Sequence, residues 1–168
     1  MVDFRGHFDI SKAFLEIDER FKSMNLFQPK TAYDMQVLSI FSQYMVVFIA
    51  RTIEGSIKNI VYTKCSILHK SEAEMEEIVK KLDEFQNPNK EKIFTCFNEI
   101  LSIELKADDF SEEQFTSLNQ IVKDRHRIAH SDYDLKAVQA IKSLPDVEKH
   151  YNNIKEFISK ICEIVSLN

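Results

Sequence analysis

Residues that break regular structure are rare in this sequence, with only two glycines and three prolines among 168 residues. Because turn-rich β folds need such residues at most of their chain reversals, their scarcity favours long helices. Hydrophobic residues make up 44% of the chain, which is enough to bury a core without disulfide bonds or metal ions. The length fits one domain. We therefore expect a single all-α domain over residues 1–168, a compact bundle of about five to seven helices.

The expected helices follow from apolar residues at helical spacing and from Ser or Thr residues at their starts. Three of these starts have an acidic residue or a glutamine three positions later, as in a capping box: Thr31 with Asp34, Ser71 with Glu74, and Ser111 with Gln114. The pattern predicts helices over residues 11–24, 31–63, 71–85, from 87 onward, 111–130, 135–142 and 145–165. In the fourth of these, Asn87 is expected as the cap and Pro88 in the first turn.

Cysteine usage and the apolar segments indicate a cytoplasmic protein. The three cysteines are far apart and odd in number, which is typical of reduced thiols in a core. The beginning of the sequence lacks the layout of a signal peptide. Residues 37–50 are the most apolar stretch, but it is short and contains Ser39, Ser42 and Gln43. We therefore expect a buried core helix there and no membrane span.

The charge of the chain places a condition on any nucleic-acid function. Its formal net charge is −5, so the molecule as a whole does not attract RNA. A local basic patch would be needed, and one segment offers it. Five residues with cationic or imidazole side chains lie within eight positions: Lys123, Arg125, His126, Arg127 and His130. No Cys/His spacing resembles a zinc site, and we expect neither a metal nor a cofactor.

The position of Arg125 relative to His130 constrains the local structure. In an unbroken helix, residues five apart are rotated by about 140° from one another. The two side chains can therefore converge only if the helix ends or bends near His130, and the polar residues 131–134 are a plausible end. Cationic groups at such a helix end are favoured by its partial negative charge.

Arginine and histidine together suit RNA cleavage by the 2′-hydroxyl of the RNA itself. That reaction needs a base, an acid for the 5′-oxygen, and cations that stabilise the charge on phosphorus. His130 is the candidate base or acid, with His126 as a second imidazole. Arg125 would bind the scissile phosphate, and Arg127 is either a solvated charge or a contact to the RNA backbone. No metal is required for this chemistry.

The segment Arg125-His126-Arg127-Ile128-Ala129-His130 resembles the ribonuclease motif of the HEPN superfamily. In that group four to six residues separate an Arg from a following His, at the end of a helix in a helical bundle. Arg125, Ala129 and His130 match the commonest form of the motif, whereas His126 and Ser131 depart from it. The resemblance runs from about Tyr33 to the last residue. RiboL-PSP and MAE-type HEPN proteins are the nearest branches.

The resemblance implies a metal-independent endoribonuclease that dimerises across the motif. It also implies a role in toxin–antitoxin or phage-defence systems, with RNA as substrate and an antitoxin or other protein as a possible partner. Members of the superfamily often carry an acidic residue in a helix that faces the motif. Glu54 is the candidate for that role here, where it would orient Arg125 or His130; the alternative is an ordinary ion pair with Arg51 on the helix surface.

Two other readings stay open at this point. The chain could be a catalytically inactive HEPN module that binds RNA, a nucleotide or a protein partner. It could also be a helical antitoxin or adaptor without a nucleic-acid role. The remaining histidines, His7, His69 and His150, have no partners at a meaningful spacing, and we expect them on the surface.

Overall fold

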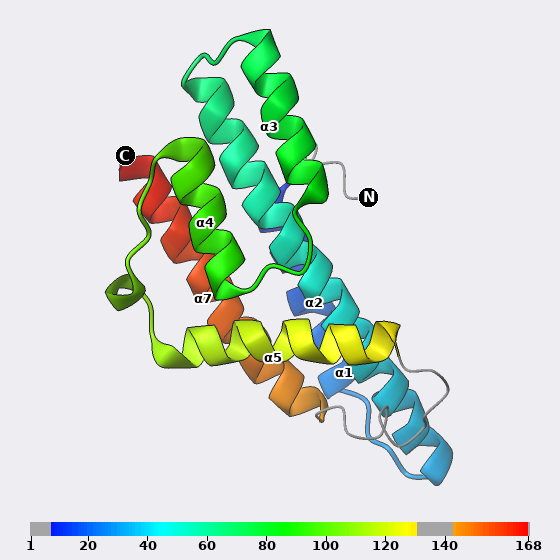
Figure 1. Ribbon diagram of the computed structural model, residues 1–168. Coiled ribbons are helices and arrows are strands. Elements are labelled where there is room, and N and C mark those ends of the chain that lie inside the picture. Colours follow the sequence, from blue (N-terminus) through cyan, green and yellow to red (C-terminus); the bar gives the residue numbers. More distant parts are fainter. Residues whose placement is uncertain (1–7, 131–142, 168) are drawn as a thin grey trace.

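A computed structural model describes residues 8–130 and 143–167, and every long regular element in these ranges is an α-helix (Figure 1). The helices are α1 (Ile10–Asn25), α2 (Ala32–Ile67), α3 (Glu72–Glu84), α4 (Lys90–Leu101), α5 (Glu112–Ala129) and α7 (Leu144–Leu167), and a short 3-10 turn, η1 (Ala107–Asp109), precedes α5. The expected all-α bundle is confirmed. The helix expected over residues 135–142 lies outside the described residues.

The capping boxes set the starts of three helices as expected. At α2 the Thr31 hydroxyl accepts the backbone N–H of Asp34 at 3.1 Å, and the Asp34 carboxylate accepts that of Thr31 at 2.8 Å. The same reciprocal bonds open α3 and α5. Each box satisfies backbone N–H groups that have no partner within the helix, and for this reason the pattern is readable from local sequence.

The start of α4 differs from the expectation, because Asn89 and not Asn87 is the cap. Asn89 has the extended backbone of a capping residue, and its side-chain oxygen accepts the N–H of Lys92 at 2.9 Å. Asn87 instead has a φ of 51°, in the left-handed region that asparagine tolerates better than most residues. Since the residue before a proline is disfavoured in the right-handed helical region, Asn87 adopts a turn conformation ahead of the buried Pro88.

The centre of the bundle is α2, a helix of 36 residues that contacts α1, α3, α4, α5 and α7. In Figure 1, α5 runs across both α2 and α7, and these three helices make the most extensive contacts of the described part of the chain. By length and composition alone α2 could span a membrane, with a mean hydropathy of 1.3 in its most apolar 18-residue window, of which 39% is buried inside the protein. Its contacts with five helices favour its role as the core helix.

The three cysteines could act as nucleophiles or metal ligands only if their thiols were deprotonated. Cys65 and Cys96 are buried, Cys162 is half-buried, and all three are free thiols. Burial raises the pKa of the Cys96 thiol to about 12, and it raises the pKa of Cys65 and Cys162 as well. A thiol that stays protonated is a poor nucleophile and a poor metal ligand, so the cysteines are packing residues.

The histidines outside the basic segment have different environments. His69 is exposed, as expected, whereas the surface position expected for His150 is wrong. The His150 side chain lies between α7 and α5, and its Nδ1 is 3.0 Å from the Ser117 hydroxyl oxygen, which also accepts a hydrogen bond from Asn153. This burial depends on how α7 packs against α5. His7 lies outside the described residues.

Candidate functional site

The C-terminal end of α5 carries the basic segment. The helix ends at Ala129, and His130 follows as its C-cap with φ −120° and ψ 16°, its backbone N–H bonded to the His126 carbonyl at 3.0 Å. The expected helix end near His130 is therefore present. Ile121 and Asp124 are buried on the inner face of the helix, so the segment is anchored to the bundle.

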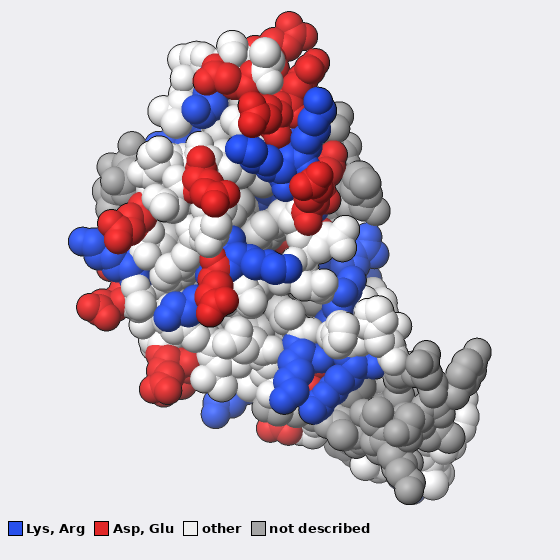
Figure 2. All heavy atoms as spheres, viewed as in Figure 1, with Lys and Arg blue, Asp and Glu red and all other residues white. Residues whose placement is uncertain are grey.

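Charge is distributed unevenly over the molecule. Figure 2 shows basic side chains gathered over the region where α5 ends in Figure 1, while acidic side chains gather over α3. Lys123, His126, Arg127 and His130 are all exposed in this segment. An acidic protein can attract phosphate through such a local patch, since exposed charges more than about 10 Å away are largely screened at ordinary ionic strength.

His126 and His130 form a close pair at this helix end. Their ring centroids are 4.4 Å apart and their planes are inclined by 46°. The spacing of four residues places both rings on one side of the helix. Because both residues are exposed, two imidazoles are available to a ligand from solvent within one chain. The sequence predicted His126 as a second imidazole, and the fold places its ring beside that of His130.

Arg125 points to a different partner. It is half-buried, and its Nη1 donates a hydrogen bond of 2.6 Å to the side-chain oxygen of Asn87, which lies 38 residues earlier in the connection between α3 and α4. No hydrogen bond or ion pair joins Arg125 to His130 within the described residues. The helix end thus brings the two histidines together, and a separate loop holds the arginine.

Asn87 is a candidate site residue that the sequence did not reveal. Its sequence pattern, Asn before Pro, predicts a helix cap. That prediction missed that the Asn87 side chain accepts a hydrogen bond from Arg125 instead. The left-handed backbone and the buried Pro88 hold Asn87 in place, so the Arg125 guanidinium gains a fixed acceptor. The local signal for this role was an asparagine near the start of α4 that does not act as the helix cap.

Arg127 is held along its own helix. Asp124, only 1% exposed, accepts a hydrogen bond from Gln120 Nε2 at 2.8 Å, and one of its oxygens lies 3.5 Å from Arg127 Nη1. Arg127 itself remains exposed. Asp124 therefore aligns the Arg127 stem and partly neutralises its charge, while the outer face of the guanidinium stays open to solvent.

Glu54 lies on α2 and pairs with Lys58, with 2.8 Å between Oε1 and Nζ. Lys58 is 1% exposed, so the carboxylate compensates a buried ammonium group. The alternative pairing with Arg51 is wrong, since Arg51 is exposed and Glu54 binds one turn further along the helix. Within the described ranges no hydrogen bond links Glu54 to Arg125 or His130, and the orienting role of Glu54 stays a prediction.

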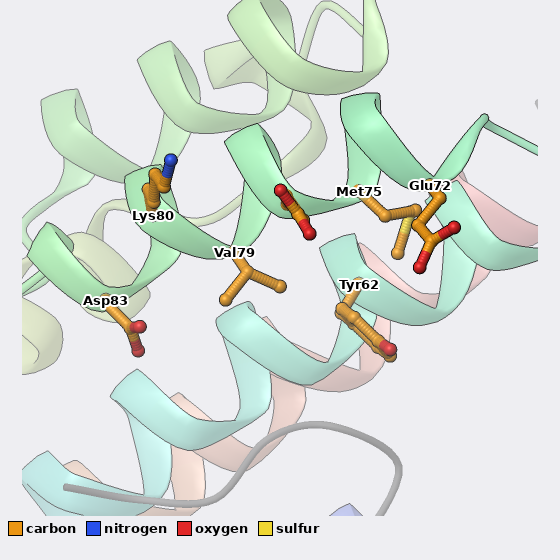
Figure 3. Close-up of a pocket in the computed structure, with 7 residues that line it drawn as sticks. Tyr62, Glu72, Met75, Val79, Lys80 and Asp83 are labelled. Atoms are coloured by element: carbon orange, nitrogen blue, oxygen red, sulfur yellow. The ribbon is translucent and has the colours of Figure 1, made fainter.

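A groove elsewhere on the surface differs in charge from the basic segment. A groove of about 400 Å³ lies between α2 and α3 (Figure 3), with an apolar floor and a mostly acidic rim; its lining residues are Tyr62, Glu72, Met75, Glu76, Val79, Lys80 and Asp83. Carboxylates on the rim repel phosphate, so this groove is no candidate for RNA. Among the described residues no cluster of three or more His, Cys, Asp or Glu side chains could hold a metal ion.

The fold and the match to known families agree on the class of protein. The all-α bundle is consistent with a HEPN domain. A family model described as RiboL-PSP-HEPN matches residues 10–167. The chain therefore belongs to the RiboL-PSP-HEPN family. No curated protein and no solved structure matches it.

Proposed function

We propose that this protein is a metal-independent endoribonuclease of HEPN type, acting in a toxin–antitoxin or phage-defence system. The observation that carries the proposal is the pair of exposed imidazoles, 4.4 Å apart, next to an arginine that Asn87 holds in place. Family membership supports the class of domain, and the chemistry of these side chains supports the reaction. The proposal includes a cytoplasmic location, which the free and partly buried cysteines support.

The reaction divides between the two histidines and the arginine. One imidazole removes the proton of the RNA 2′-hydroxyl, whose oxygen then attacks the adjacent phosphorus. The other imidazole donates a proton to the departing 5′-oxygen, so the products are a 2′,3′-cyclic phosphate and a free 5′-hydroxyl. His130 is the leading candidate for one of these roles and His126 for the other.

Arg125 stabilises the charge that develops on the phosphate oxygens. A guanidinium has five N–H donors, and the bond to Asn87 uses the Nη1 side of the group. The remaining donors can take the phosphate without loss of the anchor. A donor that is fixed before the reaction costs no reorganisation when charge develops, and fixed donors of this kind contribute about 3–4 kcal/mol in other enzymes.

RNA affinity would come from the rest of the basic segment. Lys123 and Arg127 are exposed on the same helix and suit contacts with flanking phosphates. Such contacts are independent of base sequence and weaken as salt rises. Recognition of a particular RNA site would therefore depend on other parts of the assembly.

A homodimer with the motif at its interface is part of the proposal. A two-fold axis would place two copies of Arg125 and His130 in one cleft and would concentrate positive charge there. Ile128, half-buried beside the motif, is a candidate contact, and the other candidate, Tyr133, lies outside the described residues. Since one chain already supplies two adjacent imidazoles, the dimer is not needed to supply both acid and base. Its contribution would be affinity and charge.

The alternative is a catalytically inactive HEPN module that binds RNA, a nucleotide or a protein partner. One observation favours it: Arg125 donates a hydrogen bond to Asn87, and within the described residues no hydrogen bond joins Arg125 to His130. Under this alternative the basic segment would bind phosphate without cleaving it.

The deciding experiment is cleavage of a labelled single-stranded RNA by the wild type, Arg125→Ala, His126→Ala and His130→Ala. The matched control is His69→Asn. His69 is exposed and has a left-handed backbone, which asparagine tolerates. Loss of a general acid or base lowers the rate by about 10²–10⁴-fold. The melting temperatures of His126→Ala and His130→Ala should not change because both residues are exposed. Full activity of His130→Ala would contradict the mechanism. RNA binding without cleavage by the wild type would favour the inactive module.

A further inference from the structure

We propose that His126 and His130 form a two-ligand site for a borderline or soft transition-metal cation, with Cu²⁺ preferred over Zn²⁺, and that occupation of this site blocks RNA cleavage. The binding claim rests on the geometry of the pair alone. The inhibition claim rests in addition on the proposed ribonuclease function.

The geometry of the pair fits a shared metal ion. An imidazole nitrogen bound to such a cation lies about 2.0–2.1 Å from it. Two imidazoles at adjacent positions around one ion then have ring centres roughly 4.5–5 Å apart. The observed separation of 4.4 Å is therefore already close to the bound value, and the rings are inclined rather than stacked face to face. Binding then requires rotation about the side-chain bonds that directs one nitrogen of each ring to a common point.

Accessibility also favours a ligand from solvent. Both histidines are exposed, and neither makes a hydrogen bond through its ring within the described part of the chain. His130 is the C-cap of α5, where the backbone carbonyls carry partial negative charge, and a cation is favoured at that end of a helix. Among the described residues no hydrogen-bond partner competes for either ring, and the site lies at the helix end that favours a cation.

Neighbouring cations act against the binding of a metal ion. Lys123, Arg125 and Arg127 all lie within seven residues of His130. Arg127 is partly neutralised by Asp124, and Nη1 of Arg125 is bonded to Asn87. The repulsion that remains is screened by water at an exposed site. This repulsion acts equally on every divalent ion, so the selection comes from the ligands. Hard ions such as Mg²⁺ gain little from imidazole, whereas cations that bind nitrogen strongly can overcome the repulsion.

The order of affinities follows from ligand chemistry. Imidazole suits copper and zinc, and for one set of ligands Cu²⁺ binds more tightly than Zn²⁺. Two protein ligands leave further coordination positions to water or buffer anions, so the site is expected to be reversible. A bound ion occupies the nitrogen lone pairs that the proposed base needs, and it therefore stops proton transfer without changing the fold.

The first test measures metal binding without RNA. Metal-free protein is titrated with CuSO₄ and separately with ZnSO₄ by calorimetry, and the copper form is analysed by electron paramagnetic resonance. We expect one Cu²⁺ per chain coordinated by two nitrogens, with Zn²⁺ bound more weakly. Since loss of a mere supporting group costs about 10–100-fold in metal affinity, His126→Ala and His130→Ala should each weaken Cu²⁺ binding at least that much. His69→Asn should leave it unchanged.

The outcomes separate the two proposals. Equal Cu²⁺ affinity in His126→Ala, His130→Ala and the wild type would overturn the site, and so would a stoichiometry of one ion per two chains. In the cleavage assay, Cu²⁺ should inhibit the wild type, excess EDTA should restore it, and Mg²⁺ should have no effect. A protein that binds Cu²⁺ through the pair but never cuts RNA would refute the ribonuclease and leave the metal site standing. An active enzyme whose rate ignores saturating Cu²⁺ would refute the inhibition.

Discussion

The bond between Arg125 and Asn87 makes the sharpest prediction, because it can be removed without deleting a motif residue. Asn87→Gly takes away the acceptor oxygen and keeps a residue that adopts a φ of 51° without strain. A hydrogen bond to a charged group contributes about 1.5–3 kcal/mol, and Arg125 is only half-buried, so we expect a loss of about 1 kcal/mol. For a chain of this length that lowers the melting temperature by roughly 2–4 °C.

The effect on cleavage should be much larger than the effect on stability. Without Asn87 the guanidinium samples several orientations, and a displacement of about 1 Å in a catalytic group can cost on the order of 100-fold in rate. We therefore expect Asn87→Gly to cleave RNA roughly 10–100-fold more slowly than the wild type. Asn87→Asp keeps an acceptor at the same position, and we expect its rate to fall between the other two, since a carboxylate holds Arg125 but competes with phosphate for its charge.

Asn89→Ala is the matched control. It removes the cap of α4 two residues away, and loss of a cap costs about 1 kcal/mol, so its melting temperature should fall by a similar amount. Asn89 does not contact Arg125, and cleavage should be unaffected. Rates are measured with saturating labelled RNA, and melting is followed by circular dichroism. A wild-type rate in Asn87→Gly, or an equal loss of rate in Asn89→Ala, would refute the positioning role.

Three further predictions concern the reaction, the assembly and the fold. Cleavage should persist in EDTA and leave a 2′,3′-cyclic phosphate on the RNA, whereas activity lost in EDTA and restored by Mg²⁺ would exclude the mechanism. In subunit mixing, an excess of the Arg125→Ala/His130→Ala double variant should depress wild-type activity if the site is shared across a dimer; activity that merely follows the number of wild-type chains, in a protein shown to exchange, would mean that each chain works alone. The hydroxyl of Ser71, and then its N–H, lower the pKa of the Glu74 carboxyl in the folded chain. Its stabilising effect is therefore present at neutral pH and disappears as pH falls through that depressed pKa. The melting-temperature gap between wild type and Glu74→Gln should close in acid, and a gap that persists there would contradict the assignment.

Much of the fold was predictable because its signals are local. Capping boxes at Thr31, Ser71 and Ser111 mark helix starts through bonds between residues three apart, and these bonds form in any context where the helix forms. The apolar spacing of α2 and α7 likewise appears in the printed sequence. The end of α5 near His130 was expected because Arg125 and His130 could converge only there and because polar residues follow, and the helix does end at that point.

The candidate site was predictable in part. The family match and the basic segment follow from sequence, and the spacing of His126 and His130 on one helix face is a property of helical geometry. The partner of Arg125 was not predictable, since Asn87 is distant in sequence and its pattern suits a cap equally well. Glu54 has one possible partner before it in α2, Arg51, and one after it, Lys58. Only the packing of the helix determines that it pairs with Lys58.

The sequence by itself therefore determined the helices, their starts and the place where imidazole and guanidinium groups concentrate, because each depends on interactions within a few residues. Tertiary structure decided which groups face one another. The crossing of α5 over α2 and α7 buries Asp124 and His150, and the connection between α3 and α4 carries Asn87 to Arg125. Such contacts join segments far apart in the chain, and their geometry is set by the packing of whole helices, which no local pattern encodes.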